Sequence, residues 1–163
     1  MQNETALSAQ MEDYLEAIFH LCAEHGAARV KTIAEHLDVS TPSVVGAMKT
    51  LKRRRLVHQE PYGFVHLTSK GEKVAWGVVE RHRVLANFLE HVLGLDSETA
   101  SVDACKIEHA AGAETIRRLR AVAKFVEKEP EIELGWVEAF KRFYERYENG
   151  DGDSDDTRED ESR

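Results

Sequence analysis

Hydrophobic residues recur every three or four positions along most of the chain, a spacing typical of amphipathic helices. Ser40 or Thr41 is expected to cap the third of these helices, with Pro42 in its first turn, where a missing N–H costs nothing. Gly94 is expected to end the long fourth helix. The pattern predicts helices over residues 7–24, 30–37, about 41–54, about 69–93, 96 to the break at Gly112, 114–128 and 136–147.

Two segments with alternating polarity, residues 56–59 and 64–67, interrupt the helical pattern. They flank Glu60-Pro61-Tyr62-Gly63, in which Pro at the second position and Gly at the fourth fit a type I turn, so a β-hairpin is predicted. Ser69 and Glu72 have the spacing of a capping box at the start of the next helix. Helix, short helix, tight turn, helix with a basic end and hairpin is the order of a winged helix-turn-helix. The predicted fold is therefore mainly α with a small β-hairpin.

Composition narrows the class of protein. The chain has 163 residues, 42% of them hydrophobic, which is enough to form a core and argues against wholesale disorder. No apolar run approaches the length of about 20 residues that spans a membrane, and the polar first ten residues lack a signal-peptide pattern. Two cysteines, Cys22 and Cys105, are too few for a disulfide scaffold, so a cytoplasmic protein without a membrane partner is expected.

Charge is unevenly distributed. Residues 149–163 carry seven acids against two arginines and are expected to form a disordered acidic tail. Residues 29–55 carry seven basic residues against two acids, within a chain whose net charge is −8. A basic stretch in an acidic chain suggests a polyanion-binding face. The alternative is that Lys52-Arg53-Arg54-Arg55 only complements the dipole at a helix end.

The element order favours DNA binding over that alternative, because the second helix of the motif should enter the major groove with its N-terminal end at the base edges. Phosphate contacts are expected from basic residues further along, and the hairpin tip should touch the backbone or the minor groove. The predicted base-reading residues are Ser40, Thr41, Pro42, Ser43 and Val44; the predicted backbone contacts are Lys49, Lys52, Arg53 and Tyr62.

Metal-ligating residue types recur at helical spacing. Cys105, Glu108 and His109 fall on one helical face and offer a thiolate, a carboxylate and an imidazole to one divalent cation. The alternative is a small buried cysteine beside an exposed Glu-His pair. Asp13 and Glu16, with His20 nearby, and His82 between two arginines would by themselves be ordinary solvated residues.

Five segments, taken in order and spacing, resemble the diphtheria-toxin-repressor (DtxR/MntR) family of metal-dependent repressors over about residues 8–130. The resemblance implies a winged helix-turn-helix joined to an all-helical dimerisation and metal-binding domain. It also implies Fe or Mn as corepressor and a homodimer on a palindromic promoter site. The segments are Met11–Ile18, Ile33–Leu37 with Pro42–Val44, Leu67–Gly71, Arg81–Arg83 and Cys105–His109.

The resemblance also implies a metal-ligand set of Asp13, Glu16, His82, Cys105, Glu108 and His109. This set is a hybrid, since Asp13 matches the manganese branch of the family and Cys105 the iron branch. Two second-site ligands of the iron branch are replaced by Ala86 and Ser101, and its recognition-helix Gln is replaced by Gly46.

These observations predict a metal-dependent transcriptional repressor controlling metal-homeostasis genes. Fe(II) or Mn(II) is the expected cofactor, with Zn(II) or Co(II) able to bind in vitro. A metal shared between the two parts would fix the spacing of two recognition helices, which must match major grooves about 34–36 Å apart. The expected domains are 1–70 for DNA binding, 71–148 for dimerisation and metal binding, and 149–163 for the tail. The expected dimer interface includes Phe88, Leu89, Leu93 and Ile107, with core packing as the alternative.

Two other functions are alternatives to this one. A hydrolytic enzyme with a small-molecule substrate is not expected, because no His-Glu-x-x-His or comparable motif is present. A metal-independent winged-helix regulator that senses an organic ligand or a protein partner is the remaining alternative. The aromatic residues of the last helix, Trp136, Phe140 and Phe143, would pack on the dimerisation part or recruit a partner.

Overall fold

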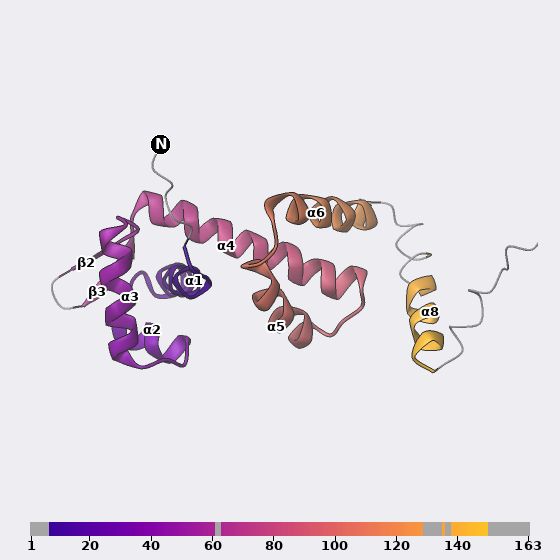
Figure 1. Cartoon of the computed structure of the whole chain (residues 1–163), viewed down its shortest axis with the longest axis horizontal. Helices are drawn as coiled ribbons and strands as arrows, with labels where there is room; N and C mark the ends of the chain where they lie inside the picture. The colour runs from indigo at the N-terminus through magenta and orange to yellow at the C-terminus, as the bar shows by residue number, and fades with distance from the viewer. Residues whose placement is uncertain (1–6, 61–62, 129–134, 136–137, 150–163) are drawn as a thin grey trace, which may run out of the picture. The chain divides into compact units, whose positions relative to one another are not determined.

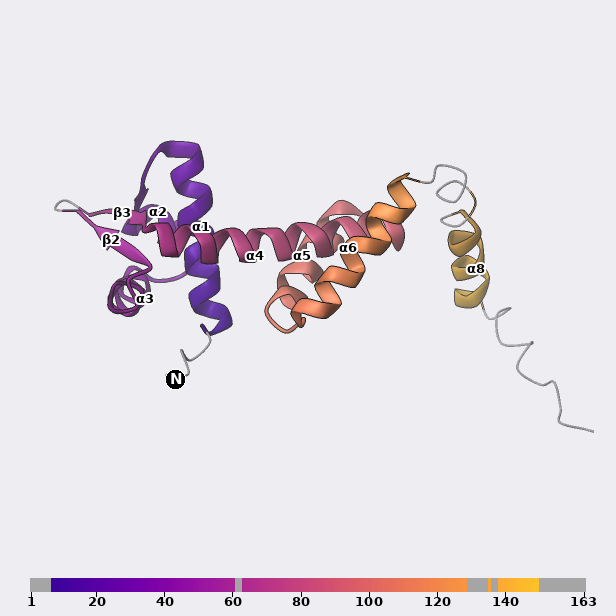
Figure 2. The same cartoon turned by 90° about the horizontal axis from the view of Figure 1, so that it is seen from above.

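The computed structural model describes residues 7–60, 63–128, 135 and 138–149. These residues form a mainly helical chain with one small sheet (Figures 1 and 2). The chain divides into two compact units, Met1–His82 (unit 1) and Arg83–Arg163 (unit 2). Among the described helices, none combines the length and apolar character needed to cross a membrane.

Three helices open unit 1: α1 (Ala9–His25), α2 (Val30–His36) and α3 (Thr41–Arg53). The Ser8 side chain accepts a hydrogen bond from the Met11 N–H at the start of α1, and Gly26 ends that helix with φ of 77°. The Ser40 side chain accepts one from the Ser43 N–H at the start of α3, with Pro42 in the first turn. The predicted helices and the Ser40 cap are therefore confirmed.

The predicted hairpin belongs to a three-stranded antiparallel sheet of order β1-β3-β2. Its strands are β1 (Ala28–Arg29), β2 (Val57–Gln59) and β3 (Phe64–Leu67). The Gly63 N–H donates to the Glu60 carbonyl at 3.2 Å. Pro61 and Tyr62 lie outside the described residues. The two-residue strand β1 was not predicted, because it is too short to show an alternating pattern.

The core of unit 1 lies where α1, α2 and α3 meet the sheet. Helix α1 packs against β3, and α2 packs against α3 (Figure 1). The fully buried side chains include Tyr14, Leu15, Ile18, Ile33, Met48, Leu51 and Val65. This core holds α3 and the hairpin side by side, and so positions the surface considered below.

Helix α4 (Ser69–Asn87) begins at Ser69, the residue that was predicted to precede and cap it. Thr68 performs the capping: its hydroxyl accepts from the Gly71 N–H at 3.0 Å, and its carbonyl accepts from the Glu72 N–H at 2.8 Å. The capping-box interpretation of Ser69 and Glu72 is therefore wrong by one position. The helical path continues as a π-helical segment, η1 (Phe88–Val92), and ends at Gly94 with φ of 76°.

Unit 2 contains α5 (Ser97–Glu108), α6 (Ala113–Lys128) and α8 (Glu138–Glu148). Its small core joins Val84, Leu85, Ala104 and Ile116, with Leu89 packed against them. A groove lined in part by Leu93, Leu95, Phe140 and Tyr144 lies where α8 meets the turn after η1, which favours packing of the last helix within unit 2. Trp136 and residues 150–163 of the predicted acidic tail lie outside the described residues.

Candidate DNA-binding surface and metal centre

The N-terminal end of α3 presents small polar side chains to solvent. Ser40, Thr41, Pro42 and Ser43 are all exposed. The Ser40 and Ser43 hydroxyls lie 2.8 Å apart. The Ser40 hydroxyl that caps α3 is therefore also one of the hydroxyls exposed at this end of the helix. Lys49, Lys52 and Arg53 are exposed further along the helix. This surface has the charge and the small side chains expected of a recognition helix.

Val44 is a correction to the predicted base-reading set. Its side chain is 0% exposed and packs in the core of unit 1 with Ala47, Met48 and Leu51. These residues occupy the inward stripe of α3, because positions i, i+3, i+4 and i+7 of a helix share one face. Val45, the next residue along α3, is 41% exposed. Its methyl groups are the apolar surface available to a thymine methyl.

The hairpin is joined to α3 by a side-chain contact. Lys52 Nζ donates to Gln59 Oε1 at 2.8 Å, which connects the basic end of α3 to β2. On the other edge of the sheet the Arg29 guanidinium lies over the Phe64 ring, 4.3 Å from its centroid. Tyr62, the predicted tip contact, lies outside the described residues.

The motif on α5 brings its three predicted ligands together. One donor atom each from Cys105, Glu108 and His109 lie within 4.8 Å of one another. His109 Nε2 lies 3.2 Å from Glu108 Oε1. Glu108 is only 1% exposed, whereas Cys105 is exposed. This is the reverse of the alternative considered from the sequence, a buried cysteine beside an exposed Glu-His pair.

Unit 1 contributes a second group of predicted ligands. The donor atoms of Glu16 on α1 and His82 on α4 lie within 4.8 Å of each other. Glu16 also forms an ion pair of 3.7 Å with the exposed ring of His20. None of the ligand clusters among the described residues includes Asp13. Asp13 is half-buried on α1. Burial of Tyr14 raises the pKa of its hydroxyl, and the negative charge of Asp13 raises it further.

Neighbouring charges frame this second group. Arg81 Nη2 donates to Glu12 Oε2 at 2.7 Å, so α4 and α1 are joined by an ion pair one residue before His82. His82 was assigned from the sequence to the second domain, and the structure places it at the end of unit 1.

The donor set fits a divalent transition-metal ion. A buried carboxylate is costly unless a cation or hydrogen bonds compensate it, and Glu108 lies beside two other ligating groups. Thiolate, carboxylate and imidazole are the ligands from which iron, manganese and zinc sites are made.

A third cluster was missed by the sequence analysis. His58 and Glu60 on or next to β2, and His66 on β3, also place one donor atom each within 4.8 Å of one another. The signal was present as two polar residues at i and i+2 on one strand. Only the register of the hairpin shows that His66 lies opposite them.

Comparison with known proteins identifies the family. The model of the iron-dependent repressor N-terminal DNA-binding domain matches residues 6–65. The model of the iron-dependent repressor metal-binding and dimerisation domain matches residues 68–135. The chain therefore belongs to the iron-dependent repressor family, a family of metal-dependent transcriptional repressors, as the resemblance implied.

Similar proteins agree with this assignment. The chain is 38% identical over 125 residues to an uncharacterised HTH-type transcriptional regulator of Methanocaldococcus jannaschii, covering 75% of this chain and 99% of that protein. It is 37% identical over 119 residues to the transcriptional regulator MntR of Bacillus subtilis, covering 73% and 83%. These relatives are named as transcriptional regulators and not as enzymes.

Solved structures show the same fold. The IdeR structure of T. acidophilum matches with a TM-score of 0.62 at 27% identity, over 73% of this chain and 54% of that chain. A manganese-dependent transcriptional repressor in complex with manganese matches with a TM-score of 0.62 at 28% identity, over 71% and 53%. The chain thus spans about half the length of these two proteins.

Proposed function

We propose that this chain is a repressor that binds promoter DNA as a homodimer when loaded with Fe(II) or Mn(II), and that it controls genes of metal-ion homeostasis in the cytoplasm. The expected domain roles follow: DNA binding in residues 1–70, dimerisation and metal binding in 71–148. The single observation that carries this proposal is the burial of Glu108 beside Cys105 and His109.

The proposed metal ligands are those of the α5 cluster together with Glu16 and His82, the pair in unit 1. Asp13 is proposed as a further ligand on the family resemblance, which matches its position on α1. When bound, the metal supplies a positive charge that compensates carboxylates otherwise costly to bury.

The choice of metal depends on ligand softness. A thiolate at Cys105 favours Fe(II) over Mn(II), whereas Asp13 and Glu16 would add hard oxygen donors that favour Mn(II). Relatives named MntR and the manganese complex among the similar structures point to Mn(II). The two metals are therefore compared directly in the experiment below.

The proposed DNA contacts are the exposed residues of α3 and the hairpin. We propose that Thr41, Ser43 and Val45 read base edges, because they are exposed near the start of α3. Lys49 and Arg53, exposed further along the helix, are proposed to contact phosphates. Ser40, Pro42 and Lys52, which are also exposed, complete this set. Tyr62, which lies outside the described residues, is proposed as a further contact from its place in the sequence.

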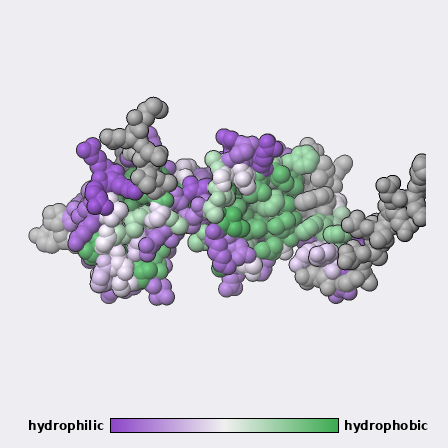
Figure 3. All heavy atoms as spheres, viewed as in Figure 1, coloured by the Kyte–Doolittle hydropathy of each residue, from purple (hydrophilic) through white to green (hydrophobic). Residues whose placement is uncertain are grey.

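The proposed dimer contact is on unit 2. Figure 3 shows hydrophobic side chains gathered over this part of the chain. The exposed hydrophobic residues of α5 and α6 include Val102, Ile107, Val122 and Phe125. Exposed apolar surface of this kind marks protein–protein interfaces. Phe88, Leu89 and Leu93 are half-buried, and Leu89 packs against the unit 2 core, so core packing accounts for part of their burial.

The experiment measures binding to a labelled fragment from upstream of the chain's own gene, by fluorescence anisotropy. Four conditions run in parallel: chelator, Mn(II), anaerobic Fe(II) and Zn(II). We expect Fe(II) or Mn(II) to tighten DNA binding relative to chelator. By linkage, DNA must tighten metal binding by the same factor.

Glu108→Ala is the decisive variant, and Glu98→Ala is its matched control. Glu98 is an exposed carboxylate on the same helix that belongs to none of the described clusters. We expect Glu108→Ala to lose the metal response and Glu98→Ala to retain it, with both folded by circular dichroism. Full metal stimulation in Glu108→Ala refutes the site, and equal DNA binding in all four conditions favours the metal-independent regulator instead.

A further inference from the structure

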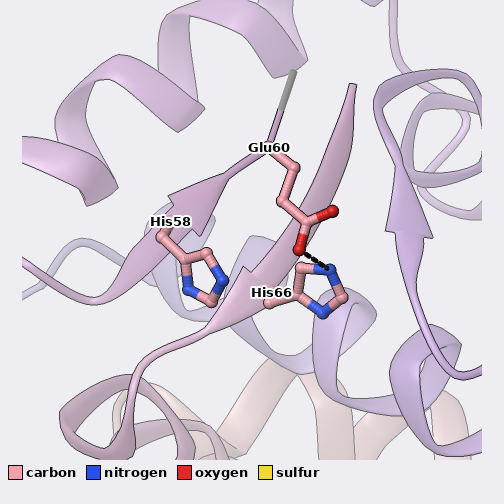
Figure 4. A group of neighbouring side chains, drawn as sticks. All are labelled: His58, Glu60 and His66. Carbon is pink, nitrogen blue, oxygen red and sulfur yellow. Dashed lines mark ion pairs between the residues drawn. The ribbon is translucent and has the colours of Figure 1, made fainter. Parts of the chain in front are cut away.

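The hairpin of unit 1 carries a cluster of ligating side chains that the proposed regulatory site does not use. Figure 4 shows His58, Glu60 and His66 directed toward one another from the two strands. Glu60 Oε1 lies 3.4 Å from His66 Nε2. The rings of His58 and His66 are stacked, with centroids 5.1 Å apart and planes inclined by 17°.

The strand register brings these residues together. His58 is paired with His66 across the antiparallel ladder. Glu60 follows His58 by two residues, so both side chains point to the same face of the hairpin. The Glu60 N–H donates to the Phe64 carbonyl at 2.8 Å, which extends the pairing to the start of the turn. The backbone therefore fixes all three side chains on one face.

We propose that His58, Glu60 and His66 bind one borderline divalent transition-metal ion, with Zn(II) preferred over Mn(II). Two imidazoles and one carboxylate form a ligand set used for zinc and for iron. Mn(II) is the weakest divalent first-row ion for such nitrogen-rich ligands. Zn(II) binds neutral histidine at about 2.0–2.1 Å, so tetrahedral ligands lie about 3.3 Å apart.

The separation of 3.4 Å between Glu60 and His66 already meets that requirement. The donor atom of His58 lies within 4.8 Å of those of Glu60 and His66. Because His58 is exposed, its side chain has room to move closer on metal binding. His66 keeps 29% of its side chain exposed, which leaves room for water as a further ligand.

The surroundings of the cluster favour a cation on balance. The three residues line a groove of unit 1 that also includes Glu72, Cys22 and Lys73. Glu72 adds a second carboxylate to the groove, and Lys73 is its one lysine or arginine among the described lining residues. Lys52, at the basic end of α3, donates a hydrogen bond to Gln59 of β2.

This proposal does not depend on the proposed repressor function, because it uses none of the residues of the α5 cluster or of the Glu16 and His82 pair. The test therefore uses the full chain carrying Glu108→Ala, which removes the buried carboxylate of the proposed regulatory cluster. Zn(II) binding is measured by isothermal titration calorimetry, and long-range ¹H–¹⁵N spectra of the histidine rings identify which rings are ligated.

His58→Gln is the test substitution and His36→Gln its control. His36 is an exposed histidine on α2 in the same unit and belongs to none of the described clusters. We expect the Glu108→Ala chain to bind Zn(II) through the His58 and His66 rings. His58→Gln should weaken this binding by at least about tenfold, because even outer-shell substitutions have effects of that size. His36→Gln should leave it unchanged.

Thermal melts by circular dichroism accompany each titration. Zn(II) should raise the melting temperature of the Glu108→Ala chain and of its His36→Gln derivative more than that of the His58→Gln derivative. Unchanged ring signals of His58 and His66 at saturating Zn(II), or equal Zn(II) affinity with and without His58, overturn the proposal. Because the ring signals report on His58 and His66 individually, neither result bears on the regulatory site.

Discussion

Gly71 stands where the first turn of α4 touches the backbone of the segment before β2. A Cβ atom at this position would overlap the Leu56 carbonyl oxygen and lie 2.9 Å from its carbonyl carbon. That oxygen already accepts hydrogen bonds from the Thr68 N–H at 2.9 Å and the Thr68 hydroxyl at 3.2 Å. The obstacle is backbone, which yields less than a flexible side chain, so we expect Gly71→Ala to move α4 away from Leu56.

The magnitude follows from three contributions. Alanine in a helix is favoured over glycine by about 1 kcal/mol. Overpacking of a close contact costs about 1–3 kcal/mol, and weakening the two hydrogen bonds to Leu56 costs up to about 1 kcal/mol each. The clash therefore outweighs helix propensity, and Gly71→Ala should destabilise the chain by about 2 kcal/mol. For a chain of this size that lowers the melting temperature by about 4–8 °C.

Gly77→Ala is the matched control, because Gly77 lies inside the same helix and a Cβ there would meet nothing within 4 Å. Only helix propensity acts at this position, so Gly77→Ala should stabilise the chain by about 1 kcal/mol. Urea unfolding at 25 °C, followed by circular dichroism, measures both variants. Stabilisation by Gly71→Ala equal to that by Gly77→Ala would refute the close approach of α4 to Leu56.

The remaining predictions concern cysteine chemistry, metal choice, DNA affinity and helix capping. Burial raises the pKa of the Cys22 thiol, so less of this thiol is thiolate at pH 8. Iodoacetamide should therefore modify exposed Cys105 first. The activating metal should slow the modification of Cys105 only, which mass spectrometry measures. Cys105→Glu replaces the soft ligand by a hard one and should shift DNA activation toward Mn(II) over Fe(II) in the anisotropy assay. Lys49→Ala and Arg53→Ala should each reduce the slope of log affinity against log salt by about 1, for every DNA sequence tested. Hydrogen bonds from Thr99 lower the pKa of Asp96, so the Asp96 carboxylate stabilises the fold above the ordinary aspartate pKa. This stabilisation is lost as the pH falls through the lowered pKa. Asp96→Ala should therefore lower the melting temperature at pH 7 and have little effect on it at pH 2.

Most of the fold was predictable because the helices of this chain are amphipathic over several turns. Ser40 and Gly94 marked helix ends through local chemistry, a side-chain cap and a left-handed residue, and both were predicted correctly. Strand β1 was missed because pairing with β3, and not its own two residues, defines it. Thr68 was missed as a cap because two adjacent hydroxyl residues gave the same local signal.

The candidate sites depend more on tertiary structure. The spacing of Cys105, Glu108 and His109 predicted that they share a face, and the structure confirms their proximity. Burial of Glu108 was not predictable, because it arises from packing around α5. Val44 was assigned to the base-reading set by its place near the helix start, although its spacing with Met48 and Leu51 already indicated the core.

Two ligand clusters of different composition bear on how a repressor of this kind distinguishes metals. Zn(II) binds nitrogen and sulfur ligands more tightly than Fe(II) or Mn(II) in almost any site, so affinity alone cannot make a regulator selective for the weaker ions. Under the proposed function, selectivity must come from geometry and ligand number at the cluster that contains buried Glu108. The hairpin cluster, with two imidazoles and one carboxylate, has the composition that Zn(II) prefers. If both proposals hold, Zn(II) binds at the hairpin cluster, which contains none of the activating residues. Fe(II) or Mn(II) then activates the repressor by binding at the cluster that contains Glu108.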